Sequence, residues 1–234
     1  MSIIPATIQP VLNKPTTICK LQTIFHPDKP YLDIGVDEAG RGPLFGRVYS
    51  AAVILPQENF SHELMKDSKL IKSEKKMDTL AQYIKDNALI WSIHYSTEEE
   101  IDELNILQAT QVCMKKCIED ILKSPIVQKN QINLLVDGNY FKTGPLMIQY
   151  PNLKEINCVK GGDNKYTCIA AASILAKHAR DEYIKKICEE NPVLIERYNL
   201  LSNKGYGTAK HMDGIREHGI TEWHRKSFAP CKMG

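Results

Sequence analysis

Residues 31–46 read YLDIGVDEAGRGPLFG, and the interpretation of the rest of the chain starts from this stretch. Its first six residues, Tyr31–Val36, favour a β-strand, and they run into the acidic pair Asp37 and Glu38. Glycines follow at positions 40, 42 and 46, which indicates a turn. The sequence therefore predicts a strand whose end presents two carboxylates beside a glycine-rich turn.

Other apolar runs and their periodicity predict the remaining elements. Further strands are expected at Val48–Leu55, Ala88–Tyr95, Gln131–Val136 and Lys154–Val159. Helices are expected from the lysine-rich segment 66–76 to near Asn87, from Thr97 to about Lys123, over Tyr166–Glu190, and around the NKGYGT turn at 203–208. This order is typical of an α/β fold with a five-stranded mixed sheet flanked by helices. A meander comes first, a crossover-connected strand follows, and the C-terminal region is helical.

The helix that begins after Thr97 has two local signals. Thr97 and Glu100 have the spacing of a capping box, in which each side chain bonds to the other residue's backbone N–H. Its apolar residues recur near helical spacing and predict a buried face: Ile101, Leu104, Leu107, Val112 and Ile118.

Length and composition indicate one globular domain with an appendage. The chain has 234 residues, of which 43% are hydrophobic and 25% charged. Residues 1–30 are rich in Pro, Thr and polar groups without periodicity, so we expect a flexible or loosely docked extension before a domain over 31–234. No stretch approaches the roughly 18 to 20 apolar residues of a membrane span, and none near the N-terminus resembles a secretory signal.

Cysteine usage and charge say less about function. The seven cysteines form no CxxC pair, so we expect free thiols in a reducing, intracellular compartment, the cytoplasm. The net charge is only +2, but from Lys160 onward 13 Lys and Arg face 9 Asp and Glu. This distribution is compatible with a phosphate-binding face and equally with ordinary solvated helices.

Four acidic residues lie at the ends of predicted elements: Asp37, Glu38, Asp137 and Asp163. If the strands that precede Asp37 and Asp137 are parallel neighbours, the two carboxylates meet at one edge of the sheet. They would repel each other unless cations lay between them, and clustered carboxylates suit hard ions such as Mg²⁺ or Mn²⁺. Taken singly, the acids also fit a plain Asp-Gly turn and a helix cap.

An ordered series of motifs resembles the type 2 ribonucleases H, and ribonuclease HII most closely. The matching segments are DEAGRGPLFG at 37–46, DSKL at 67–70, NIL at 105–107, DGN at 137–139, GGD at 161–163, IAAASILAK at 169–177, RD at 180–181, NKGYGT at 203–208 and HRKSF at 224–228. This resemblance implies the ribonuclease H-like fold. It also implies that Asp37, Glu38, Asp137 and Asp163 bind two Mg²⁺ or Mn²⁺ ions.

The activity that the resemblance implies is hydrolysis of the RNA strand of RNA–DNA hybrids. It also implies cleavage on the 5′ side of single ribonucleotides embedded in duplex DNA. One ion would activate the attacking water and the other would stabilise the leaving 3′ oxygen, giving 5′-phosphate and 3′-hydroxyl ends. We expect the enzyme to act as a monomer, with hybrids and ribonucleotide-containing DNA as its partners.

Substrate-binding residues follow from the same resemblance. Gly40, Arg41 and Gly42 would read the 2′-hydroxyl of the ribonucleotide, and Tyr206 would check for the deoxyribose after it. Lys69, Lys177 and Arg180 are candidates for phosphate contacts. Ser173 is expected to pack within its helix, and HRKSF to dock the C-terminal segment. Phe45 and Arg47 depart from the family pattern, in which small residues and proline are usual.

Three other hypotheses remain open. Ribonuclease HIII proteins typically carry Thr where Arg41 stands, Glu where Asp163 stands, and a larger N-terminal domain. A non-catalytic nucleic-acid-binding subunit could use the same fold, although the four acids are intact. A resolvase- or integrase-like protein is disfavoured by the GRG and GYG turns.

Overall fold

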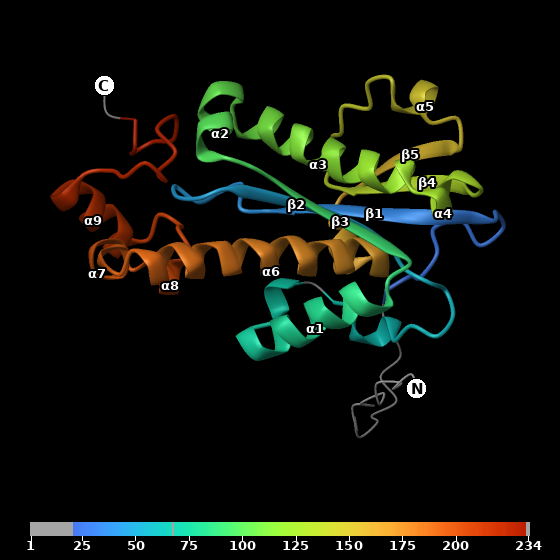
Figure 1. The fold of residues 1–234 in the computed structure, drawn as a ribbon, viewed down its shortest axis with the longest axis horizontal. Helices are drawn as coiled ribbons and strands as arrows, with labels where there is room; N and C mark the ends of the chain where they lie inside the picture. The colour runs from blue at the N-terminus through green and yellow to red at the C-terminus, as the bar shows by residue number, and fades with distance from the viewer. Residues whose placement is uncertain (1–20, 67, 233–234) are drawn as a thin grey trace, which may run out of the picture.

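A five-stranded mixed sheet forms the centre of the computed structural model, which describes residues 21–66 and 68–232 (Figure 1). The strand order is β3-β2-β1-β4-β5. The strands are β1 (Tyr31–Ala39), β2 (Val48–Ile54), β3 (Ile90–Ser96), β4 (Gln131–Asp137) and β5 (Leu153–Val159). The pairs β1–β2 and β2–β3 are antiparallel, whereas β1–β4 and β4–β5 are parallel. The predicted meander followed by crossover-connected strands is therefore confirmed.

Helices cover both faces of this sheet. The α-helices are α1 (Glu74–Asn87), α2 (Glu98–Leu104), α3 (Ile106–Lys123), α4 (Pro125–Gln128), α5 (Leu146–Gln149), α6 (Thr167–Glu190), α7 (Val193–Tyr198), α8 (Leu200–Asn203) and α9 (Ala209–His218). Short 3₁₀ turns occupy His62–Leu64, Ser68–Leu70 and Gly162–Asn164. In Figure 1, α3 lies on one side of the sheet, and α6 lies on the other with α1 beneath it.

Alternation along the strands divides the core into two layers. On β2, Ala51 and Val53 pack with α6 and α1, whereas Ala52 and Ile54 pack with α3. Helix α6 can approach β1 closely because residue 35 is a glycine. A Cβ there would lie 2.2 Å from the backbone carbon of Cys168. This contact, in the first turn of α6, places the N-terminal part of the helix beside β1, at whose end the acidic residues lie.

The single helix expected from Thr97 to Lys123 is wrong, because the chain breaks at Asn105. There φ is 68° and ψ is 160°, a conformation that a helix cannot contain. The Asn105 side chain also accepts a hydrogen bond from the backbone N–H of Gln108 at 3.1 Å, so it caps the new helix. The predicted capping box at Thr97 and Glu100 is present at the start of α2.

The break also explains why the predicted apolar face was partly wrong. Ile101 and Ile118 are buried, but Leu104, Leu107 and Val112 are 41%, 38% and 38% exposed. Interrupting the helix changes its rotational phase, so one continuous period cannot describe both parts. Within α3 the buried stripe instead includes Cys113, Met114 and Cys117.

The start of the described chain packs against the domain. Leu21 and Phe25 contact the core layer of α6, and the Gln22 backbone N–H donates to the Lys165 carbonyl at 2.7 Å. The extension expected before this point lies, over residues 1–20, outside the described residues. The six cysteines that the structure describes are free thiols. Across residues 21–66 and 68–232, no helix combines the length and apolarity that crossing a bilayer requires.

Candidate active site

Asp37 and Asp137 lie at the same edge of the sheet because β1 and β4 are parallel neighbours, with Val36 paired to Val136. The Asp37 side chain is only 5% exposed and points toward α6, where it is hydrogen bonded to Ser173. The backbone N–H of Glu38 also donates to Asp37 Oδ1 at 2.7 Å. The end of β1 and the N-terminal part of α6 thus fix this carboxylate.

The turn after β5 adds the fourth acid. Gly161 has a φ of 63°, and the backbone N–H of Gly162 donates to Asp137 Oδ1 at 2.6 Å. The next residue, Asp163, is 2% exposed, and Lys69 Nζ donates to its Oδ2 at 3.2 Å. The GGD sequence therefore works as a turn that binds one carboxylate and positions another beside it.

Burial and mutual repulsion characterise this group electrostatically. Burial raises the pKa of Asp37 well above its ordinary value, and the neighbouring charges of Glu38 and Asp137 raise it further. Burial likewise raises the pKa values of Glu38 and of Asp137, the latter also through the charge of Asp163. Concentrated negative charge in a buried place favours a cation.

The side chains present fit divalent cations by chemistry, because carboxylate oxygens are the ligands that Mg²⁺ and Mn²⁺ prefer. They do not converge on one point. In the described part of the chain, the only Asp, Glu, His or Cys trio with donor atoms all within 4.8 Å of one another is elsewhere, at Asp78, His178 and Glu182. Lys69 approaches Asp163, and Arg41 Nη1 donates to Glu38 Oε1 at 3.3 Å. Metal binding would have to displace these two cationic groups.

A pocket of about 460 Å³ opens in front of the acids. Every predicted site residue except Asp163 lines it: Asp37, Glu38, Gly40, Arg41, Gly42, Lys69, Asp137, Lys177, Arg180 and Tyr206. Asp163 lies next to it, in contact with the lining residue Lys69. Segments far apart in the sequence, from the end of β1 to the turn after α8, therefore meet around one cavity.

The glycine-rich turn forms one wall of the pocket. Gly40 has a φ of +95°, and a Cβ there would lie 2.3 Å from Arg180 Nε, so only glycine fits. Tyr206 faces this turn from the opposite wall. A Cβ added to Gly42 would meet the Tyr206 ring at 3.4 Å, and the tyrosine is 49% exposed. The Leu44 N–H donates to the Gly205 carbonyl at 2.9 Å, which fastens the two turns together.

The three predicted phosphate-contacting residues differ in their surroundings. Lys69 projects into solvent with a side chain that is 76% exposed, whereas Lys177 Nζ donates to Asp181 Oδ2 at 2.8 Å. Arg180 is 3% exposed, and its Nη2 donates to the carbonyl oxygens of Phe45 at 3.2 Å and Lys204 at 2.8 Å. In this structure the Arg180 guanidinium joins the glycine-rich turn to the GYG turn rather than extending toward a ligand.

Arg225, for which no sequence pattern indicated a place at the site, holds the glycine-rich turn from behind. Its guanidinium is fully buried and donates to four carbonyl oxygens of that turn. The acceptors are Gly40 at 2.6 Å, Arg41 at 3.0 Å, Pro43 at 2.8 Å and Gly46 at 2.8 Å. The turn therefore presents its other face to the pocket in a fixed conformation.

Further lining residues were also missed: Ser68, Asp181, Ser202, Asn203 and Lys204. Ser173 was expected only to pack, but it touches Asp37 and lies 2.9 Å, Oγ to Oγ, from Ser68. Its position four residues before Lys177 on one helix was the available signal, because residues at that spacing share a helix face. Asn203 and Lys204 lie in the NKGYGT motif, which was their signal, whereas for Ser202 we find none.

Comparison with known proteins agrees with this geometry. The family model of ribonuclease HII matches residues 34–231. The ribonuclease HII of Bacteroides thetaiotaomicron is 43% identical over 201 residues, covering 86% of this chain and 91% of that protein. That of Parabacteroides distasonis is 45% identical over 197 residues, covering 84% and 89%.

The fold is shared with solved structures as well. Ribonuclease H2 from Pyrococcus horikoshii OT3 superimposes with a TM-score of 0.63 at 23% identity, covering 86% of this chain and 95% of that one. The predicted family and fold are confirmed by these matches. The chain belongs to the ribonuclease HII family of endoribonucleases, hydrolases that cut RNA strands and depend on divalent metal ions.

Proposed function

We propose that this enzyme hydrolyses the RNA strand of RNA–DNA hybrids and cuts duplex DNA on the 5′ side of single embedded ribonucleotides. The observation that carries the proposal is the shared pocket, in which the carboxylates face the glycine-rich turn and Tyr206. A phosphate at the acids then has its own ribose within reach of Gly40–Gly42. The proposal includes a monomeric enzyme that works in the cytoplasm.

Asp37, Glu38, Asp137 and Asp163 are the proposed metal ligands. Two Mg²⁺ or Mn²⁺ ions, when bound, would supply the acidity that activates an attacking water and the positive charge that stabilises the leaving 3′ oxygen. The protein positions the donors: Gly162 N–H orients Asp137, and Ser173 and Glu38 N–H orient Asp37. The proposed products carry 5′-phosphate and 3′-hydroxyl ends.

Ribose recognition is assigned to Gly40, Arg41 and Gly42. With four carbonyls of the turn bonded to Arg225, the remaining backbone groups can approach a 2′-hydroxyl without rearrangement. The exposed Tyr206 ring can stack on the next sugar, where a 2′-hydroxyl would crowd it. Selection of a ribonucleotide followed by a deoxyribonucleotide is the expected outcome.

Backbone contacts complete the proposal. Lys69 and Lys177 lie at the pocket and can pair with phosphates on either side of the cut. Arg180 binds the carbonyls of Phe45 and Lys204 and so positions the two turns. Because it also lines the pocket, we assign it a phosphate contact as well. Such pairing makes affinity for the duplex fall as salt increases.

The test uses three DNA duplexes of one sequence: all deoxyribose, one embedded ribonucleotide, and four consecutive ribonucleotides. With Mg²⁺ or Mn²⁺ we expect cleavage of the last two only, and cleavage 5′ of the single ribonucleotide, mapped by sequencing gel and end labelling. Tyr206→Ala should reduce cutting at the single ribonucleotide more than at the four-ribonucleotide tract. Absence of cutting at the single ribonucleotide with both ions, while the tract is cut, would restrict the substrate to longer hybrids.

A further inference from the structure

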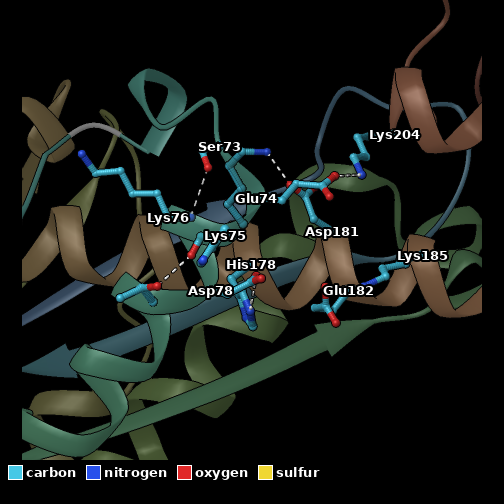
Figure 2. Close-up of polar contacts among 12 residues, drawn as sticks. Ser73, Glu74, Lys75, Lys76, Asp78, His178, Asp181, Glu182, Lys185 and Lys204 are labelled. Atoms are coloured by element: carbon cyan, nitrogen blue, oxygen red, sulfur yellow. Dashed lines mark hydrogen bonds and ion pairs between the residues drawn. The ribbon is translucent and has the colours of Figure 1, made fainter. Parts of the chain in front are cut away.

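A second group of metal-ligating side chains lies outside the acidic pocket, between α1 and α6. Asp78 projects from α1, and His178 and Glu182 project from successive turns of α6, four residues apart (Figure 2). One donor atom from each lies within 4.8 Å of the other two. All three line a separate cavity of about 170 Å³.

The state of His178 suits a metal ligand. Its side chain is 18% exposed, and His178 Nε2 lies 3.3 Å from Asp78 Oδ1, the contact drawn in Figure 2. Its Nδ1 atom is buried and has no hydrogen-bond partner within the described residues. Burial lowers the pKa of His178, and the charge of Lys85 lowers it further, so the ring is neutral and keeps a lone pair.

Two of the four lysines that line the same cavity are paired with acids outside the trio. Lys177 Nζ lies 2.8 Å from Asp181, and Lys204 Nζ lies 3.2 Å from Glu74. Lys185 is the one that approaches a member of the trio, at 4.0 Å from Glu182 Oε1, and both side chains are 51% exposed. A surface pair of this kind contributes little and is easily exchanged for a metal bond.

We propose that Asp78, His178 and Glu182 bind one transition-metal ion, Zn²⁺ by preference, at a site distinct from the catalytic acids. Imidazole together with two carboxylates suits Zn²⁺, whereas the all-carboxylate group in the other pocket suits Mg²⁺ or Mn²⁺. Tetrahedral donors around Zn²⁺ lie about 3.3 Å apart, given bonds of about 2.0 Å. Asp78 and Glu182 can close to that spacing because their side chains are 57% and 51% exposed.

The ion would fasten α1 to α6 next to the catalytic pocket. Helix α1 directly follows the segment that carries Ser68 and Lys69, and Ser68 bonds to Ser173 on α6. Zinc binding is therefore expected to raise the melting temperature and to hold this segment in place. The proposal does not depend on the substrate assigned above.

The experiment uses the full chain with Asp37→Asn and Asp137→Asn, which weakens metal binding at the catalytic acids. Calorimetric titration with ZnCl₂ in excess Mg²⁺ should give one zinc per chain. Adding His178→Ala should weaken that binding at least about 10-fold, the effect expected for disturbing a metal site. His94→Ala is the matched control, because His94 also pairs with an aspartate, Asp120 at 2.6 Å. It should leave zinc affinity unchanged.

Cobalt provides an independent readout. Co²⁺ in this site should give a visible absorption band without the intense near-ultraviolet band of thiolate ligands, and His178→Ala should remove it. Circular dichroism checks that each variant is folded, and Glu182→Gln serves as a second variant. The proposal is overturned if zinc does not bind, if His178→Ala and Glu182→Gln bind it like the parent, or if the spectrum shows thiolate ligation.

Discussion

Arg225 donates a 2.6 Å hydrogen bond to the carbonyl oxygen of Gly40, although the two residues are 185 positions apart. Three more carbonyls of the same turn accept from this guanidinium. A buried cation is costly unless all its donors are used, and here its planar fork matches a turn of backbone carbonyls. The residue shapes the substrate side of the pocket without lining it.

Replacing Arg225 by Lys should impair the enzyme while keeping the charge. A lysine cannot reach four carbonyls at once, and each buried carbonyl left without a donor costs about 1–3 kcal/mol. We expect a lower free energy of unfolding and a larger loss of cleavage at a single ribonucleotide than at a ribonucleotide tract. Lys226→Met, at the exposed neighbouring position, is the control. Equal losses on both substrates would mean that the turn does not govern selectivity.

Asp137→Asn should abolish turnover while preserving the fold. Removing one charge relieves repulsion with Asp37, so the variant should be at least as stable as the parent without metal. Saturating Mn²⁺ should raise the melting temperature of the parent by mass action, and should raise that of the variant much less. We expect activity to fall by at least about 100-fold, the lower end of the loss seen when one electrostatically stabilising group is removed from an enclosed site. Full activity would remove Asp137 from the catalytic group.

Two buried histidines should make the C-terminal region sensitive to acid. The Thr221 N–H donates to His224 Nδ1, and His224 Nε2 lies 3.1 Å from His211 Nε2. The other ring nitrogen of His211, Nδ1, contacts the Tyr206 carbonyl. Both rings must be neutral, and burial lowers the pKa of His224 to about 3. Because the folded-state pKa lies below the unfolded value, this stability is complete above about pH 6.5 and is lost as the pH falls toward 3.

Urea unfolding at pH 7.5 and pH 5.0 checks this prediction. The contribution of His224 should fall by about 2 kcal/mol between those values. Asp37 and Asp137 have raised pKa values, so their contribution to the free energy of unfolding increases, rather than decreases, as the pH falls. The comparison is therefore with His224→Gln, which should lose less stability on acidification than the parent. An equal loss of stability on acidification in both proteins would show that His224 is not the source of the acid sensitivity.

Asn105 offers a test of the break between α2 and α3. Its backbone conformation is essentially reserved for glycine and costs about 1–3 kcal/mol in other residues. Asn105→Gly relieves that strain and loses only a few tenths of a kcal/mol of capping. Asn105→Ala keeps the strain and loses the cap, at a cost of about 1 kcal/mol. Chemical denaturation should rank Gly at or above Asn, with Ala lowest; the reverse order would indicate that the helix runs through.

Much of the fold could be predicted because its signals are local. Strand-forming runs closed by proline, glycine or acidic residues located all five strands to within a few residues. Asp37 and Asp137 were expected to meet if their strands were parallel neighbours, and the structure shows that these strands are. The Asn105 break could not be predicted in this way, since a single residue with positive φ leaves the surrounding periodicity almost unchanged.

What the sequence did not predict depends on contacts between distant segments. HRKSF was expected to dock the C-terminal segment, yet nothing local indicates that Arg225 binds carbonyls near Gly40. Arg180 was a candidate phosphate contact, but its Nη2 donates to carbonyls of two turns that only the folded chain brings together. A small residue such as Ser173 gives the same pattern whether it packs or bonds to Asp37.

The connection from Arg225 back to the glycine-rich turn has a consequence for synthesis. The last of the four acids is Asp163, so a polypeptide still on the ribosome contains all four carboxylates before Arg225 is added. Arg225, which holds the turn proposed above to read the ribose, is translated only after α9. A nascent chain is thus expected to lack ribonucleotide selectivity until that late segment emerges and folds back onto residues made near the beginning.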